Sequence, residues 1–334
     1  MIQEFRQGFA RLWRTIEIVA ISNGGERVTH LYPNDCYFAH LSLYRFASQF
    51  SLDKRALDAG SGTGYGAAYL ADHGAQQVIG LELSADGVAL SRSYFQRPNL
   101  RFVNQDIQQL SGIPEQSIDL LVCSNVLEHL PDVRHFLREC CRVLDENGYL
   151  LIAVPPVIHD GSRAENLANP YHINVWSPRQ WHSTLKSYFI DVQCFRHVPT
   201  LPGAQLNFAN QPHESKVTER DFAFLPVTLD EWLEAPTLTS VLLARRPRDL
   251  DSLPNGLQPI VFVDDSVTKP VATRRSPWWA SLSTRAYRAA LPPASRRWQL
   301  GVIAQRAWRM YREPGIGTLF RKMVSLPANP GSHD

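Results

Sequence analysis

The residues of this chain whose types and spacing point most directly to chemistry are an acid and three glycines near residue 60. The stretch Arg55–Leu70 reads RALDAGSGTGYGAAYL, with Asp58 just before Gly60, Gly62 and Gly64. Its composition is typical of a short buried strand before the glycines and of a helix after them. A glycine turn at this junction lets backbone N–H groups approach a ligand that any Cβ would obstruct. The pattern therefore predicts a site for a nucleotide-like cofactor.

Two cofactors of this kind fit a glycine turn. Gly62–Ala67 matches GxGxxG/A and Glu82 follows about 20 residues later, so the dinucleotide fingerprint is formally met. Asp58, however, would repel a pyrophosphate and attract an ammonium group. Glu82 ends the next predicted strand and suits two ribose hydroxyls, and Asp106 follows the third and can accept a hydrogen bond from an adenine amino group. A cationic amino acid, a ribose and an adenine together describe S-adenosylmethionine (SAM).

In these motifs the chain resembles the class I SAM-dependent methyltransferases over about residues 26–247. Asp58–Gly64 matches the DxGxGxG motif of that family, and residues 117–132 (SIDLLVCSNVLEHLPD) look like the fourth-strand signature of its small-molecule and saccharide branch. The resemblance implies a Rossmann-like, doubly wound seven-stranded sheet of order 3-2-1-4-5-7-6 with an antiparallel seventh strand. It also implies the following cofactor-binding residues: Asp58, Gly60, Ser61, Gly62, Gly64, Glu82, Leu83, Asp106, Ile107, Ser124 and Asn125.

The candidates for handling the methyl acceptor follow the fourth predicted strand. Asn125, Glu128 and His129 share one face if a helical turn starts there, and His172 lies beyond the fifth strand. One interpretation makes His129 or His172 a general base, since the pKa of histidine is near neutral. In another, Glu128, His129 and His172 bind a divalent metal, as the similar ExxEH set of small-RNA 2′-O-methyltransferases does; Asn125 in place of the first Glu weakens that interpretation.

A third, structural interpretation is that Glu128 and His129 only order the cofactor loop. We favour a catalytic or acceptor-binding role for His129, His172 and Glu128 without a metal.

The elements that must position these residues alternate between strands and helices, which indicates a parallel sheet with helices on both faces. The clearest predicted helix runs from Val133 to Leu144, and a second from Tyr37 to Phe50. The predicted strands are Arg55–Asp58, Gln77–Leu83, Leu100–Asn104, Leu120–Ser124 and Tyr149–Val154, followed by an antiparallel pair from Tyr188–Phe195 and Thr239–Ala244.

Four segments follow from changes in composition. Residues 1–50 are predicted to form a helical cap or lid, 51–247 the methyltransferase domain, 248–270 a linker and 271–334 a basic tail. In the first segment, Glu26-Arg27 and His40 with Tyr44-Arg45 loosely resemble a pattern of bacterial methyltransferases from surface-polysaccharide gene clusters. The insert from about residue 198 to 234 is expected to line the acceptor pocket or to form a surface loop.

The bulk composition is ordinary for a globular protein, and we expect a cytoplasmic protein that is at most peripheral to a membrane. Five cysteines include no CxxC pair, which favours buried thiols in a reducing compartment. No apolar run reaches the ~18 residues that a membrane span requires.

The tail beginning at residue 271 has eleven basic and two acidic side chains, a net charge of +9, so that residues 1–270 carry −7 of the chain's total of +2. Four tryptophans lie among the arginines. This composition suits an amphipathic helix on the inner face of an anionic membrane or on a protein partner. Nucleic-acid binding and a merely solvated extension are the alternatives.

Together these features predict an enzyme that O-methylates a small molecule, saccharide or glycolipid, with a role in polysaccharide biosynthesis. The alternatives are methylation of nucleic acid or protein, which predicts a basic cleft beside Asp58, and a catalytically inactive SAM-binding scaffold. The intact cofactor motifs argue against the loss of cofactor binding.

Overall fold

The computed structural model describes residues 27–201, 206–208, 214–234 and 236–253, all of which belong to one compact unit. Residues 1–26 of the predicted helical cap, most of the linker and the basic tail lie outside the described residues. Within the described part, no helix combines the length and apolar character needed to cross a membrane.

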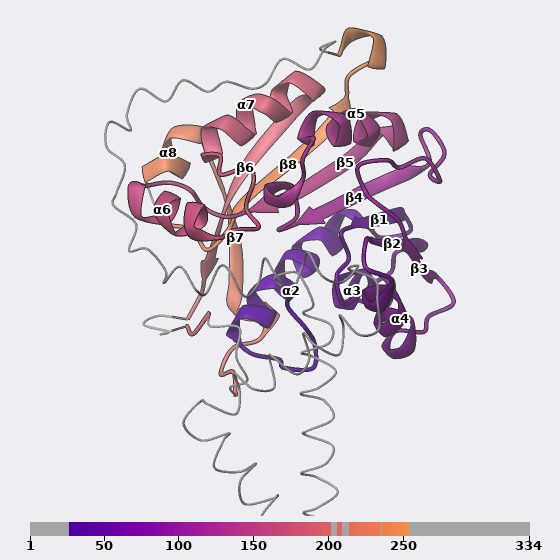
Figure 1. Ribbon diagram of the computed structural model, residues 1–334, viewed down its shortest axis with the longest axis horizontal. Coiled ribbons are helices and arrows are strands. Elements are labelled where there is room, and N and C mark those ends of the chain that lie inside the picture. The colour runs from indigo at the N-terminus through magenta and orange to yellow at the C-terminus, as the bar shows by residue number, and fades with distance from the viewer. Residues whose placement is uncertain (1–26, 202–205, 209–213, 235, 254–334) are drawn as a thin grey trace, which may run out of the picture. The chain divides into compact units, whose positions relative to one another are not determined.

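An eight-stranded sheet forms the centre of the described unit (Figure 1), in the order β3-β2-β1-β4-β5-β8-β6-β7. The strands from β1 to β5 are parallel, whereas β8, β6 and β7 pair antiparallel. The strands are β1 (Arg55–Ala59), β2 (Gln77–Glu82), β3 (Leu100–Asn104), β4 (Ile118–Ser124), β5 (Leu144–Val154), β6 (Phe189–Pro199), β7 (Phe222–Val227) and β8 (Ser240–Pro247).

Helices cover both faces of this sheet (Figure 1), as the alternating pattern predicts. Side chains of α5 and α7 pack in the core cluster on one face, and side chains of α2 and α3 pack in the cluster on the other. The α-helices are α2 (Asp35–Ala47), α3 (Tyr65–Asp72), α4 (Ala85–Tyr94), α5 (Val133–Val143), α6 (Asp160–Ala168), α7 (Pro178–Tyr188) and α8 (Leu229–Glu234).

The register of the parallel strands brings their carboxyl ends to one edge. Asp58 on β1 pairs with Gly80 on β2 and with Val122 on β4, and Glu82 on β2 pairs with Asn104 on β3. The residues that follow these strand ends therefore lie along the edge where open α/β sheets bind their ligands.

The predicted Rossmann-like sheet is confirmed, with one strand more than predicted. The antiparallel pair is confirmed as β6 and β8, so β8 takes the place predicted for the seventh strand. The sheet, however, has an eighth strand, β7, which comes from the insert predicted to be a pocket or loop. The residues of β7, FAFLPV, are all apolar, so they show no alternation of polar and apolar side chains, and Pro226 is unusual inside a strand. The strand lies at the edge of the sheet, and only Phe222 is fully buried.

Two helix boundaries also differ from the sequence prediction. Helix α5 ends at Val143, and β5 begins at once with Leu144, which is buried in the core. Helix α2 begins earlier than predicted because the Asn34 side chain caps it by accepting from the Tyr37 N–H, and its predicted last turn is a 3-10 turn, Ser48–Phe50.

Candidate active site

Glycine is needed at the three positions of the turn after β1 for different structural reasons. All three have positive φ, which favours glycine. A Cβ on Gly60 would lie 2.5 Å from Val126 Cγ2, and one on Gly64 would lie 2.6 Å from Ser91 Oγ, so these two glycines allow close packing. A Cβ on Gly62 would meet nothing within 4 Å. Gly62 is therefore the glycine that faces open space, where a ligand can approach.

Asp58 is fully buried at the end of β1, and its carboxylate is only half satisfied. Oδ1 accepts a hydrogen bond of 3.0 Å from the Tyr44 hydroxyl, whereas Oδ2 has no hydrogen-bond partner among the described residues. Burial raises the pKa of Asp58 to about 7, against hydrogen bonding by Tyr44 and the Ala67 backbone, which lowers it, and the charge of Glu82 adds to the rise. A buried acid of this kind is stabilised by a positively charged ligand group.

Glu82 at the end of β2 is held by donors from three parts of the chain. Its Oε1 accepts from Arg27 Nη2 at 2.8 Å and from the Ser84 N–H at 2.9 Å, and its Oε2 accepts from the Gly62 N–H at 3.0 Å. The Arg27–Glu82 ion pair is largely shielded from solvent. The segment before α2 therefore reaches the cofactor edge through Arg27, and Glu82 is fixed beside the glycine turn.

The remaining predicted cofactor residues differ in how far their side chains are exposed to solvent. Leu83 is 71% exposed, and Asp106 is also exposed, with its Oδ1 accepting from the Gln108 N–H. The side chain of Ile107, in contrast, packs in the core. Ser124 and Asn125 follow β4, and Asn125 Nδ2 donates to Ser124 Oγ at 3.2 Å.

The residues present fit S-adenosylmethionine by a test that does not depend on the motif. Asp58 Oδ2 and the buried Ser61 Oγ have no hydrogen-bond partner in the described part of the chain, and both lie close in sequence to the open space at Gly62. A buried carboxylate that needs a cation, next to a backbone that a ligand can approach, suits the amino-acid end of that cofactor better than a pyrophosphate.

The predicted acceptor residues sit on a turn that the segment before α7 holds in place. The turn Leu127–His129 is a 3-10 helix, not the helical turn from Asn125 that the spacing suggested, and Asn125 itself has φ +53°. Asn174 Nδ2 donates to the carbonyls of Leu127 and Leu130, and the N–H groups of residues 173 and 174 both donate to the Glu128 carbonyl. These bonds bring His172 next to His129.

The three candidate side chains Glu128, His129 and His172 lie close together. One nitrogen of each histidine and one Glu128 carboxylate oxygen lie within 4.8 Å of one another. The rings of His129 and His172 are 5.0 Å apart between centroids, and His129 Nε2 lies 4.0 Å from Glu128 Oε1. The arrangement can bind the acceptor oxygen, remove its proton or hold a cation.

The sequence did not predict the contacts that three further residues make at the site. Tyr44 and Arg27 were assigned to a lid, yet Tyr44 donates to Asp58 and Arg27 pairs with Glu82. Gly66 allows the first of these contacts, because a Cβ there would lie 2.0 Å from the Tyr44 ring. The only sequence signal for this packing was the extra glycine inside α3.

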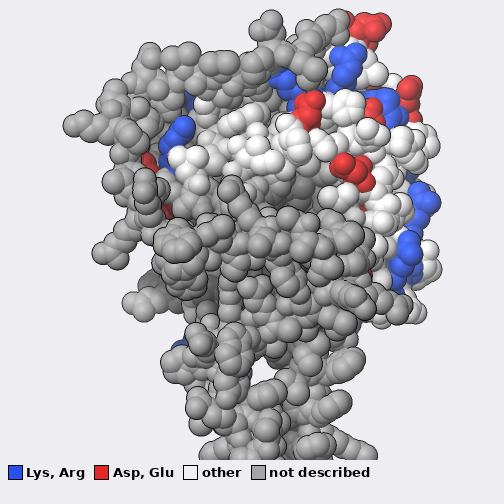
Figure 2. Space-filling model, viewed as in Figure 1, with Lys and Arg blue, Asp and Glu red and all other residues white. Residues whose placement is uncertain are grey.

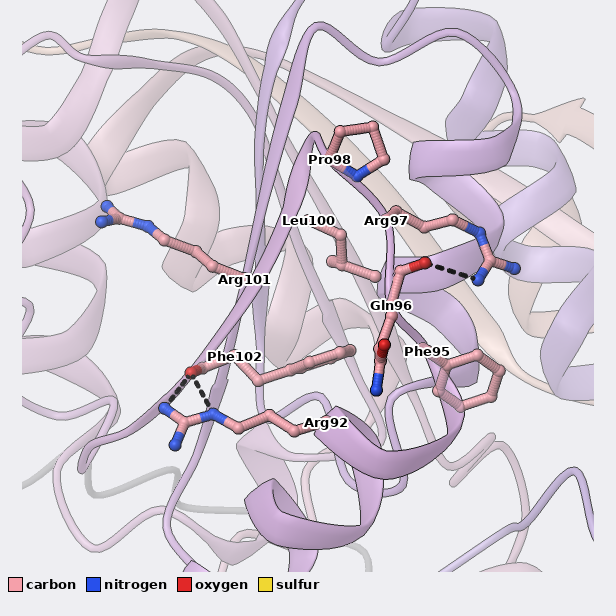
Figure 3. Close-up of a pocket in the computed structure, with 8 residues that line it drawn as sticks. All are labelled: Arg92, Phe95, Gln96, Arg97, Pro98, Leu100, Arg101 and Phe102. Atoms are coloured by element: carbon pink, nitrogen blue, oxygen red, sulfur yellow. Dashed lines mark hydrogen bonds between the residues drawn. The ribbon is translucent and has the colours of Figure 1, made fainter.

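A separate surface cavity of about 520 Å³ lies at the beginning of β3, away from the carboxyl edge (Figure 3). Two of its arginines are engaged by the protein: Arg92 donates to the Phe102 carbonyl, and Arg97 makes a bidentate ion pair with Asp72. None of the predicted cofactor residues lines this cavity. It is therefore not the site described above.

Comparison with known proteins finds similarity to methyltransferases in the central part of the chain. Residues 57–152 match the model described as "Methyltransferase domain". The chain is 35% identical over 150 residues to a probable S-adenosylmethionine-dependent methyltransferase of Mycolicibacterium smegmatis. The aligned segment is 44% of this chain and 57% of that protein. A relative of the same description from Mycobacterium tuberculosis is 32% identical over 154 residues, 46% of this chain and 55% of that protein. The matches thus span little more than half of these relatives.

Two further similarities are more distant. A ubiquinone biosynthesis O-methyltransferase of Serratia proteamaculans is 28% identical over 103 residues, 30% of this chain and 42% of that protein. The solved structure of a possible histamine N-methyltransferase from Thermotoga maritima aligns with a TM-score of 0.48 at 15% identity, covering 64% of this chain and 91% of that one.

Proposed function

We propose that this chain, which carries a class I SAM-dependent methyltransferase domain, transfers a methyl group from S-adenosyl-L-methionine to a hydroxyl of a small molecule. The predicted family and cofactor are confirmed for the domain, and the predicted α/β fold is confirmed with one additional strand. The acceptor and the residues that act on it are proposals. The observation that carries the function is the half-satisfied, buried Asp58 beside the open Gly62.

The cofactor supplies a methyl group activated by a sulfonium. The protein therefore has to bind the cofactor and the acceptor, align the acceptor oxygen with the methyl group and remove the proton of the acceptor. Asp58 is placed to receive the ammonium group and Glu82 the ribose hydroxyls. Asp106 and exposed Leu83 suit the adenine. On the acceptor side, His129, His172 and Glu128 are placed to orient the attacking hydroxyl and take up its proton.

The surroundings of the histidines favour an acceptor with an apolar part. Leu167, Tyr171 and Ile173 lie in the segment that carries His172 and are 62%, 40% and 60% exposed. Exposed apolar side chains grouped near a reactive site suggest a ligand that covers them. A hydroxylated ring with a hydrocarbon substituent and a glycolipid both have this chemistry, and the predicted polysaccharide role is compatible with the second.

The alternative of nucleic-acid methylation predicted a basic cleft beside Asp58. On the described surface visible in Figure 2, basic and acidic side chains are interspersed. Asp58, Glu82 and Asp106 make the cofactor edge acidic. These observations favour the small-molecule acceptor.

Calorimetric titration of the full chain with SAM tests the cofactor site. We expect Asp58→Ala to weaken binding beyond detection, while the exposed control Glu146→Ala binds like the wild type. Unchanged affinity in Asp58→Ala would overturn the assignment. Incubation of the wild type with methyl-labelled SAM and a cell extract should then place label in the organic-solvent fraction; label confined to protein or nucleic acid would contradict the proposed acceptor.

A further inference from the structure

The acceptor cluster of Glu128, His129 and His172 has the composition of a metal site. Two imidazoles and one carboxylate, from two segments far apart in the sequence, bring one ligand atom each to within 4.8 Å of the others. The Glu128 side chain is 4% exposed and that of His129 is 29% exposed. The Glu128 carboxylate is therefore nearly buried, whereas the His129 ring is partly accessible to solvent.

The partners of both histidines determine which nitrogen carries the proton. His129 Nδ1 lies 2.9 Å from the carbonyl oxygen of Tyr171, which can only accept, so Nδ1 is the protonated nitrogen. His172 Nδ1 lies 2.7 Å from Asn166 Oδ1. The amide of Asn166 is oriented by its own Nδ2, which donates to the Ser162 carbonyl at 2.8 Å. In a neutral imidazole each Nε2 then carries a lone pair.

This arrangement is the one found around metal-binding histidines, whose second N–H typically donates to a carbonyl or carboxylate oxygen. His129 Nε2 faces Glu128 Oε1 at 4.0 Å. Metal–ligand bonds of about 2.0–2.2 Å require ligand atoms roughly 3–3.5 Å apart, so the side chains have to close by about 1 Å. Such a movement is within the reach of side-chain torsions at a partly exposed cluster.

We propose that Glu128, His129 and His172 bind one divalent transition-metal cation through the Glu128 carboxylate and the two Nε2 atoms. This inference rests on the proposed function, because the cation would lie on the acceptor side of the site. Two imidazoles and one carboxylate suit Zn²⁺, Mn²⁺ or Co²⁺ better than Mg²⁺ or Ca²⁺, which prefer oxygen ligands. The sequence favoured a site without metal because Asn125 replaces an acid; the oriented Nδ1 atoms are the observation that reverses this preference.

Three protein ligands leave coordination positions open for an acceptor oxygen. A hydroxyl held there loses its proton to water more readily, because the cation lowers its pKa. Its oxygen then forms the new O–CH₃ bond as the S–CH₃ bond breaks and the electron pair stays on sulfur. The exposed edge of His129 provides the path by which the proton reaches solvent.

Titration with Co²⁺ tests the proposal by binding rather than by activity. The full chain, freed of any affinity tag and of metal by a chelator, is titrated calorimetrically while the visible d–d absorption is recorded. We expect one cation per chain and a binding constant weakened at least about tenfold in His129→Gln/His172→Gln. The control His135→Gln, which changes an exposed histidine on α5, should bind like the wild type.

A second variant addresses the orienting amide. Asn166→Leu removes the acceptor for His172 Nδ1 and should weaken Co²⁺ binding about tenfold, while Asn166→Asp restores it. Wild-type stoichiometry and affinity in the double histidine variant would overturn the proposal, as would the absence of Co²⁺ binding in the wild type.

SAM affinity and the midpoint of thermal unfolding are measured on the same samples. Both should stay at wild-type values in the histidine variants, which shows that they are folded. A wild-type protein that binds SAM but no cation refutes the metal site alone, whereas a wild type that binds no SAM, either with or without Co²⁺, refutes the proposed function.

Discussion

In the protein without cofactor, the charged form of Asp58 is suited to attract a cation but is costly to keep buried. Its position lets it attract a cationic ligand, but burial without water makes its ionised form costly and raises its pKa to about 7. The folded protein therefore holds a proton on Asp58 between about pH 4 and 7, where the unfolded chain does not. This carboxyl makes the protein less stable as pH rises through that window, and a bound cationic group would offset the cost above it.

The hydroxyl of Tyr44 favours the charged form of Asp58. Tyr44→Phe removes this donor, so we expect the pKa of Asp58 to rise further and the pH below which SAM affinity declines to move up by about one unit. Calorimetric SAM affinities between pH 5.5 and 9 measure the shift. Tyr69→Phe, whose ring stacks on His73 at the surface, serves as the control, and identical pH profiles for wild type and Tyr44→Phe would contradict the role of the hydroxyl.

At the scale of elements, the turn Leu127–His129 is too short to hold its own geometry. It has three residues, and the segment of residues 172–174 supplies most of the hydrogen bonds that anchor it. The position of the candidate catalytic side chains thus depends on a contact between the β4–α5 and α6–α7 connections (Figure 1).

The variant Asn174→Ala tests the role of this turn in methyl transfer independently of cofactor binding. The Asn174 Nδ2 donates at 2.9 Å to the Leu127 carbonyl and at 2.7 Å to the Leu130 carbonyl, and leaving both unpaired costs about 1–3 kcal/mol of stability. We expect a tenfold or greater decrease in the methyl-transfer rate with SAM affinity unchanged. Asn147→Ala, in the exposed segment at the start of β5, is the control; equal rates in the two variants would show that the turn does not depend on Asn174.

At the scale of the whole unit, α2 connects the cofactor edge to the antiparallel end of the sheet. Arg45 donates from Nε to the Glu219 carbonyl and from Nη2 to the Phe222 carbonyl, at the start of β7. On the same helix, Ser42 Oγ lies 2.9 Å from Nε2 of the fully buried His197 on β6, whose ring stacks on Phe224 of β7. The eighth strand is therefore part of the core that holds α2.

Acid should weaken this core before it protonates most carboxylates. Burial lowers the pKa of His197 to about 3 and that of His40 to about 4, whereas both titrate near 6.5 when unfolded. The unfolded chain binds more protons below pH 6.5, so this stability is present above pH 6.5 and is lost as pH falls toward 4. Asp58 opposes the loss with one proton, whereas His30, whose pKa burial also lowers to about 4, adds to it. The net decrease in the free energy of unfolding is therefore at least roughly 1 kcal/mol per pH unit.

Urea unfolding at pH 7.5, 6.5, 5.5 and 4.5 measures this decrease as a falling midpoint. Asp58→Asn removes the opposing group, so its midpoint should fall more steeply over the same range. A midpoint independent of pH from 6.5 to 4.5 in the wild type would contradict the assignment of two neutral buried histidines.

The sequence by itself determined the cofactor and most of the fold. Asp58, the three glycines, Glu82 and Asp106 lie where successive strands end, and parallel pairing brings all such ends to one edge whatever the details of packing. The strands from β1 to β5 could be located because they are buried and apolar. The family comparison confirms the domain that these local patterns predicted.

Only the tertiary structure decided which side chains complete the site. Tyr44 and Asp58 are 14 residues apart, Arg27 and Glu82 are 55 apart, and His129 meets His172 through a segment beyond β5. Such contacts depend on how helices and loops pack, and no local period in the sequence records them. The same is true of the Nδ1 partners that turn two histidines and a glutamate into a candidate cation site.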